Sequence, residues 1–225
     1  MFRSFTRWVV CGVALLSLAS LPLLGQGKKS IAEKIEWTWE VTPEHVQPRL
    51  PNVLLLGDSI TRNYYPTVVK ELDGKANVYL FSASTSVGDP RLPGQLKEFF
   101  KMVDVKFRVI HFNNGMHGWG YSETEFGENF SAYIKAIRRD APGAKLAWAN
   151  ITPVPKDDPS AQTNARIDAR NAITEPIIEA EKIPLNDQHA LMKQHPEMYR
   201  DNVHPSEEAS QLQGKQAAEA IEKLL

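Results

Sequence analysis

A short apolar run at residues 52–57 constrains the fold of this chain more than any other feature. The run reads Asn52-Val-Leu-Leu-Leu-Gly57 and shows no alternation of apolar and polar residues. Strands with one face in water alternate, whereas strands of parallel sheets are buried on both faces and are apolar throughout. The run therefore predicts a strand inside a parallel sheet, and such a sheet needs helices on both of its faces.

Similar runs recur along the chain, with helical patterns between them. Further strands are predicted at 76–81, 107–112, 145–149 and 183–185, and helices at 62–72, 92–103, 123–139, 164–181 and 205–225. Pro66 and Pro176 are expected to interrupt two of the helices. This order predicts an α/β fold, a three-layer α/β/α sandwich with about five parallel strands.

The composition fits one globular domain. The chain has 225 residues, 42% of them hydrophobic and 24% charged, which is enough for a single core. Lys and Arg total 26 against 27 Asp and Glu. This balance gives no strong positive field, so we expect no nucleic-acid partner.

The first 27 residues predict a signal peptide, and hence a secreted or periplasmic protein. Arg3 and Arg7 precede an uncharged apolar stretch at 9–24, which Pro22 interrupts. An uncleaved membrane anchor is the alternative interpretation, and we expect no other membrane contact. Cleavage would remove Cys11, the one cysteine of the chain, so we expect neither disulfides nor thiol ligands in the exported part.

The rest of the chain is predicted to form an arm and a domain. The arm, residues 28–50, packs on the domain, residues 51–225. Trp37 and Trp39 lie two residues apart in a polar part of the arm. That spacing is more typical of an anchored edge strand than of a ligand site.

Two polar segments carry candidate catalytic residues. Gly57-Asp58-Ser59 follows the first predicted strand, where parallel sheets bind ligands and where a helix N-terminus favours developing negative charge. Ser59 is a candidate nucleophile; the alternative interpretation is that Asp58 or Ser59 only caps the helix. Asp201 precedes His204 by three residues, so its carboxylate can orient the imidazole as a base; a chance pair in a surface loop is the alternative.

Together these segments resemble the SGNH, or GDSL-type, hydrolases. That family carries a Gly-Asp-Ser block near the start of its domain and an Asp-x-x-His block near the end. The resemblance spans the predicted domain and implies a flavodoxin-like sheet. It also implies a serine esterase without metal or organic cofactor, in which Ser59 is the nucleophile, His204 the base and Asp201 the orienting acid.

The resemblance further implies an oxyanion hole. Its donors are the backbone N–H groups of Ser59 and Gly88 and one Asn side chain. The usual Gly-x-Asn-Asp block is absent, because the third strand is followed by Asn-Asn-Gly-Met-His-Gly-Trp at 113–119. We predict Asn114 as the side-chain donor, with Asn113 and His117 as alternatives.

The same loop suggests a substrate. Asp58, Asn113, His117 and Trp119 are predicted to contact it, and aromatic faces such as that of Trp119 suit sugar rings. Alternatively, Trp119 only anchors the loop. Export and the aromatic loop favour O-acetyl esters on carbohydrates. A lipase or other small-ester hydrolase, an acyltransferase and a weakly catalytic glycan-binding domain remain alternatives, and no oligomeric state is predicted.

Overall fold

The computed structural model of the chain describes Met1 and residues 29–225, so the predicted signal peptide lies outside the described residues except for Met1. Six strands form one sheet in the order β1-β3-β2-β4-β5-β6. Their bounds are β1 Thr38–Val41, β2 Asn52–Gly57, β3 Asn77–Ala83, β4 Phe107–Phe112, β5 Lys145–Ala149 and β6 Leu185–Asn186.

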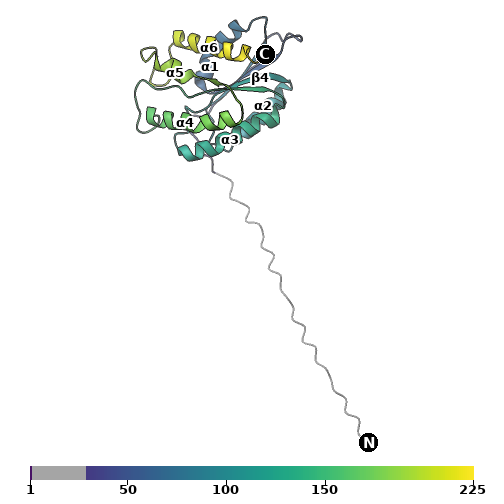
Figure 1. Ribbon diagram of the computed structural model, residues 1–225, viewed down its shortest axis with the longest axis vertical. Coiled ribbons are helices and arrows are strands. Elements are labelled where there is room, and N and C mark those ends of the chain that lie inside the picture. Colours follow the sequence, from purple (N-terminus) through teal and green to yellow (C-terminus); the bar gives the residue numbers. More distant parts are fainter. Residues whose placement is uncertain (2–28) are drawn as a thin grey trace.

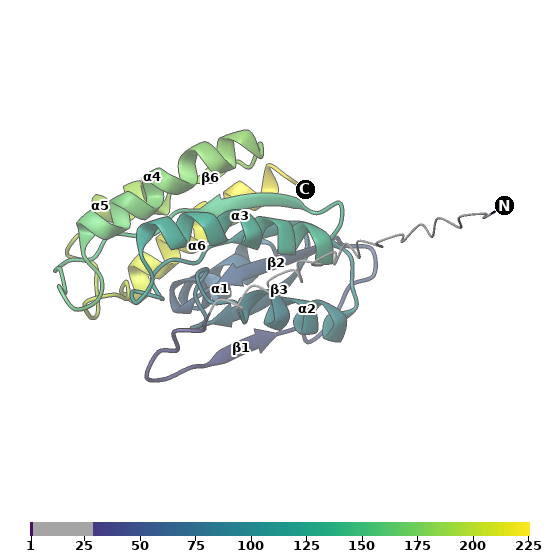
Figure 2. The same cartoon turned by 90° about the horizontal axis from the view of Figure 1, so that it is seen from below.

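Helices cover both faces of the sheet (Figure 1). Helices α1 and α6 pack together on one face, and α2, α3 and α4 lie side by side on the other, as Figure 2 shows from below. The described part of the chain contains no helix long and apolar enough to cross a membrane. The helix bounds are α1 Ser59–Glu71, α2 Leu92–Val103, α3 Glu123–Asp140, α4 Asn164–Ala180, α5 Gln188–Lys193 and α6 Glu207–Glu222.

The parallel part of the sheet confirms the predicted fold class. Strands β2 to β6 pair in parallel, and the leucines of β2 are at most 1% exposed. The arm adds β1, which pairs antiparallel with the edge of β3. The five parallel strands have the flavodoxin-like order, in which ligands bind where the chain changes direction across the sheet. Here that place is the carboxyl ends of β2 and β4.

Two details of the helices differ from the prediction. Helix α1 begins at Ser59 and runs without a break through Pro66, and α4 likewise runs through Pro176. Each proline removes one backbone hydrogen bond, and both prolines are exposed, so neither ring has to fit into the core. The short helix α5 was not predicted, because six residues carry too little periodicity.

A cluster of aromatic side chains packs around β4 and β5. Trp148 on β5 is fully buried, and its ring centroid lies 4.7 Å from that of Phe130 on α3 and 5.1 Å from that of Phe112 on β4. Large buried aromatic rings contribute strongly to core stability. Strands β4 and β5 are therefore fixed against α3, and the loop after β4 starts from a rigid support.

Candidate active site

The turn from β2 to α1 places Ser59 in the first turn of the helix. The carboxylate of Asp58 caps α1 by accepting a hydrogen bond from the backbone N–H of Ile60 at 3.0 Å. A Cβ on Gly57 would lie 2.2 Å from Oγ1 of Thr61, so only glycine fits at that position. Asp58 is fully buried, so its carboxylate serves the helix end rather than the substrate surface to which it was assigned.

Ser59, His204 and Asp201 form a continuous chain of hydrogen bonds. Oγ of Ser59 lies 2.8 Å from Nε2 of His204. On the other side of the ring, Nδ1 lies 2.9 Å from Oδ2 and 3.1 Å from Oδ1 of Asp201. The structure thus brings together three residues that are up to 145 positions apart in the sequence.

The ionisation of Asp201 decides which nitrogen of His204 is the base. Partial burial opposes ionisation, but hydrogen bonds from the backbone N–H groups of His204 and Val203 and from the His204 ring lower the pKa of Asp201 to about 2. A carboxylate only accepts hydrogen bonds, so Nδ1 carries the proton. Nε2 is then free to accept the proton of Ser59.

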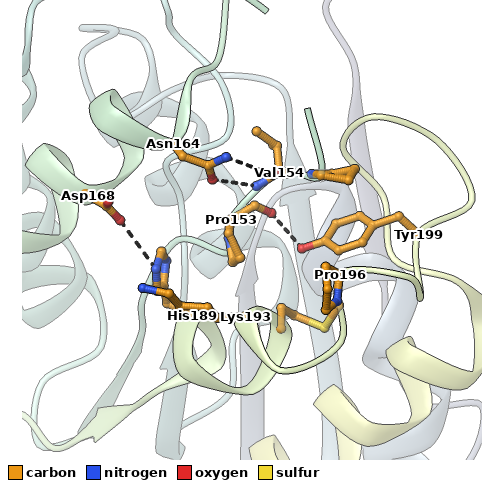
Figure 3. A pocket seen from close by; sticks show the side chains of 10 residues that line it. Pro153, Val154, Asn164, Asp168, His189, Lys193, Pro196 and Tyr199 are labelled. Carbon is orange, nitrogen blue, oxygen red and sulfur yellow. Dashed lines mark hydrogen bonds and ion pairs between the residues drawn. The ribbon is translucent and has the colours of Figure 1, made fainter. Parts of the chain in front are cut away.

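A pocket of about 220 Å³ lies beside the segment that carries Asp201 and His204, and Tyr199 lines it. Figure 3 shows the Tyr199 side chain reaching across this pocket to the 153–155 segment. The Tyr199 hydroxyl donates to the carbonyl of Pro153 at 2.6 Å, and the residue pairs with Pro205 in an isolated bridge. Burial raises the pKa of Tyr199, so the hydroxyl stays a donor. Tyr199 therefore anchors the loop that presents the acid and the base.

Replacing Tyr199 with Phe should loosen this loop. Loss of the hydroxyl removes one hydrogen bond, worth about 0.5–1.5 kcal/mol, and kcat should fall by about twofold to tenfold. The measurement is kcat together with urea unfolding. Tyr65→Phe is a matched control, because its hydroxyl donates to the Val78 carbonyl at 3.1 Å, away from His204. Equal activity losses in the two variants would contradict a positioning role for Tyr199.

Ser59 and His204 line one groove of about 590 Å³. The loop after β4, the N-terminal arm, the segment 160–162 and Val203 form the rest of its wall. The arm reaches the groove through Glu33, which the sequence analysis did not single out. The remaining wall includes Ile31, Met116, His117, Trp119 and Gln162.

The two asparagines after β4 bind backbone rather than the groove. Nδ2 of Asn113 donates to the carbonyl of Ala149 at 2.8 Å, which ties the ends of β4 and β5 together. Asn114 is 1% exposed; its Nδ2 donates to the carbonyl of Thr85 at 3.0 Å, and its Oδ1 accepts from the N–H of Val87 at 3.2 Å. Neither asparagine lines the groove, so the role predicted for Asn114 in the oxyanion hole remains a prediction.

Gly88 lies in the loop that Asn114 holds. A Cβ there would lie 2.7 Å from the ring of Tyr121, which explains the glycine. Within the described chain, no group accepts a hydrogen bond from the backbone N–H of Gly88 or of Ser59. Ser59 lines the groove described above, whereas Gly88 does not. The oxyanion role that the family resemblance implies for the Gly88 N–H therefore remains a prediction.

His117 and Trp119 do line the groove, and a buried arginine holds their loop. The Arg170 guanidinium on α4 donates to the carbonyls of Gly115, His117 and Gly118 at 2.8–3.0 Å. It also lies over the Trp119 ring, 3.9 Å from its centroid. Trp119 is thus both a loop anchor and part of the groove wall. Arg170 was not predicted as a site residue, because an arginine in a polar helix gives no sequence signal of burial.

No group of three or more His, Cys, Asp or Glu side chains in residues 29–225 is arranged to hold a metal ion. The chemistry that this geometry supports is nucleophilic attack by a serine, with an imidazole as base and a carboxylate that orients it. Such an arrangement is used for acyl transfer from esters.

Comparison with known protein families agrees with this geometry. The model of the GDSL-like Lipase/Acylhydrolase family matches residues 55–212, a span that begins within β2 and ends within α6. The chain belongs to this family. It is therefore an ester-hydrolysing serine hydrolase of the GDSL type, as the resemblance implied.

Solved structures with the same fold include several esterases. An acetyl xylan esterase, AlAXEase, is 17% identical with a TM-score of 0.61, covering 76% of this GDSL-type chain and 99% of the other. A carbohydrate esterase family 3 protein from Talaromyces cellulolyticus is 17% identical with a TM-score of 0.61, covering 78% and 98%. A member of the lipolytic G-D-S-L family from Veillonella parvula is 18% identical with a TM-score of 0.60, covering 77% and 99%.

At 17–18% identity, the likeness to these structures shows that the GDSL-type hydrolase shares their fold, and it does not show its substrate. No curated protein matches the chain. The substrate must therefore be argued from the site.

Proposed function

We propose that the chain is a secreted esterase that removes acetyl groups from carbohydrates with a Ser59–His204–Asp201 triad. The observation that carries the proposal is the unbroken hydrogen-bond chain from Oγ of Ser59 through His204 to Asp201. Serine acyl transfer needs a nucleophile that is hydrogen-bonded to a base, and a base that is oriented by an acid, and these three groups are arranged in that way.

The reaction follows from these contacts. Nε2 of His204 takes the proton of Ser59 as Oγ attacks the ester carbonyl, and the carbonyl oxygen becomes an oxyanion. His204 then returns the proton to the leaving sugar hydroxyl, which gives an acetyl-serine. Water, deprotonated by His204, attacks this ester, and acetate leaves as the proton returns to Oγ of Ser59.

The size and lining of the groove support the acetylated-carbohydrate part of the proposal. The groove of about 590 Å³ falls in the usual range for small-molecule sites, and Trp119 contributes an indole to its wall. Two of the proteins with the same fold are an acetyl xylan esterase and a carbohydrate esterase. An acetyl ester of a sugar fits both the groove and these likenesses.

Export completes the proposal. The charge pattern of residues 1–27, two arginines followed by an uncharged apolar stretch, is that of a secretory signal. Expression of the full chain in a secreting host should therefore give a mature protein whose N-terminal sequence starts near residue 28. An uncleaved, membrane-bound product would contradict this part.

Acetate release from a panel of acetylated polysaccharides tests the substrate. We expect release from at least one polysaccharide, and among p-nitrophenyl esters we expect the acetate to have the highest kcat/KM. A preference for long acyl chains would instead indicate a lipase. Transfer of acetyl to an added sugar in place of acetate release would indicate an acyltransferase. A folded protein that releases no acyl group and is not labelled by a fluorophosphonate would refute the esterase proposal.

A further inference from the structure

A second carboxylate–imidazole pair lies in the same groove as the triad. Oε2 of Glu33 lies 2.9 Å from Nδ1 of His117, and its Oε1 accepts the backbone N–H of Gly118 at 3.0 Å. Glu33 and His117 both line the groove with Ser59 and His204. Because Glu33 binds the ring and the backbone of the same loop, the orientation of the His117 ring is fixed.

The second ring nitrogen of His117 is not used by the fold. Within the described chain, Nε2 has no hydrogen-bond partner, and the side chain is 16% exposed. The two asparagines of the same loop differ, since each donates its amide to a backbone carbonyl and lies outside the groove. His117 is therefore the side chain of this loop with a free polar atom at the groove wall.

The surroundings of His117 favour its charged form. Burial opposes the charge, but the hydrogen bond that the ring donates to Glu33 and the negative charges of Asp58, Glu33 and Glu36 outweigh it and raise the pKa of His117 above its usual 6.5. In return, the pKa of Glu33 is lowered. Three carboxylates, from the arm and from the cap of α1, thus act on this ring.

Two cations on neighbouring elements are engaged elsewhere. The Arg170 guanidinium binds the His117 carbonyl oxygen rather than its ring. Arg62 lies over the ring of Trp37, 4.9 Å from its centroid, and Trp37 meets the His117 ring edge to face at 5.9 Å. Neither arginine replaces Glu33 as the partner of His117.

We propose that His117, whose ring is held at the groove wall by Glu33, donates Nε2–H to the oxyanion, in the position where the family's usual block supplies an asparagine. The inference rests on the proposed function, since it names a further donor for the same reaction. Nδ1–H is given to the carboxylate, so only the protonated ring carries a second N–H to donate. A charged donor binds an oxyanion more strongly than a neutral amide does. In this role His117 donates a hydrogen bond and passes no proton on.

This assignment predicts a pH dependence that an asparagine would not give. The donor is present below the raised pKa of His117 and is lost as the pH rises through it. The activity of the wild type should therefore fall on the alkaline side of its pH profile, and this alkaline limb belongs to His117.

The first experiment compares His117→Ala with His117→Asn on p-nitrophenyl acetate. Loss of an oxyanion donor should lower kcat of the Ala variant by about 10²–10³-fold, with little change in KM. Asn supplies a donor that does not titrate, so it should restore activity in part and remove the alkaline limb. Fluorophosphonate labelling of Ser59 and circular dichroism should show that both variants are folded.

The second experiment shifts the alkaline limb of the pH profile by replacing Glu33 and leaves His117 unchanged. Glu33→Gln keeps an acceptor for Nδ1–H but removes the charge, so the alkaline limb should shift to lower pH. The His117 titration, followed by NMR, should shift with it. Glu40→Gln, an exposed glutamate on β1 of the same arm, is the matched control and should leave both unchanged.

The outcomes separate this inference from the proposed function. If wild type hydrolyses the ester and Ser59→Ala does not, while His117→Ala stays within threefold of wild type, the esterase stands and the role of His117 is overturned. An alkaline limb that persists in His117→Asn would also overturn it. If wild type itself shows no hydrolysis and no labelling, the proposed function fails, and the inference fails with it.

Discussion

Ser59→Ala should lower kcat for ester hydrolysis by about 10⁶-fold. The reason lies in the hydrogen-bond chain: without Oγ, Nε2 of His204 has no nucleophile to deprotonate, and the remaining donors have no oxyanion to bind. The measurement is acetate release over hours at high enzyme concentration. Fluorophosphonate labelling, which needs an activated serine, should disappear in parallel.

Ser131→Ala is the matched control for this change. Ser131 lies in the middle of α3, and the groove does not include it. It should keep wild-type kcat and full labelling. Residual hydrolysis by Ser59→Ala at more than about one hundredth of the wild-type rate would mean that another residue is the nucleophile.

The strands that position Ser59 are predictable from sequence because burial leaves a local signal. The runs at β2, β4 and β5 have the same bounds in the structure as in the prediction, and each is mostly apolar, although β4 also contains Arg108 and His111. Burial on both faces disfavours polar residues in such strands, and glycine or a polar residue then marks the end. The position of a nucleophile directly after β2 follows from the same pattern.

The wall of the groove is not predictable in this way. Glu33 lies 84 positions from His117, in a polar arm whose sequence gives no hint of a partner. The spacing of Trp37 and Trp39 favoured an edge strand, and β1 is one. The sequence gives no signal, however, for β3 as the partner of β1 or for the contact of Glu33 with the site. Long-range contacts between polar residues depend on the finished fold, and a single sequence does not record them.

The loop after β4 could be predicted only in part: its position follows from the motif resemblance, but the roles of its residues do not. The resemblance located the loop and named Asn113, Asn114 and His117 as candidates. Only the contacts distinguish them, because both asparagines bind backbone carbonyls while His117 faces the groove with Glu33 behind it. A substitution that breaks a family motif is therefore best interpreted together with the residues that pack against it.

Asp201→Asn should lower kcat by about 10⁴-fold at neutral pH, with the fold intact. Oδ1 of Asp201 accepts the backbone N–H groups of Val203 and His204 at 2.8 and 2.7 Å. An asparagine must keep its oxygen toward these two donors, so its NH₂ group would face Nδ1 of His204. Nδ1 then becomes an acceptor, the proton moves to Nε2, and the nitrogen that faces Ser59 can no longer act as base.

The pKa of Asp201 sets the pH range in which wild type and Asp201→Asn differ in the charge of this side chain. Since that pKa is about 2, the wild-type carboxylate stays ionised through the neutral and mildly acidic range, and only strong acid would imitate the variant. NMR of the His204 ring nitrogens should show protonation at Nδ1 in wild type and at Nε2 in the variant. Asp168→Asn removes the carboxylate of another Asp–His pair, 3.4 Å from His189 in the pocket of Figure 3, and should keep full activity. If Asp201→Asn lost less than tenfold, Asp201 would be a loop residue, and His204 would take its tautomer from elsewhere.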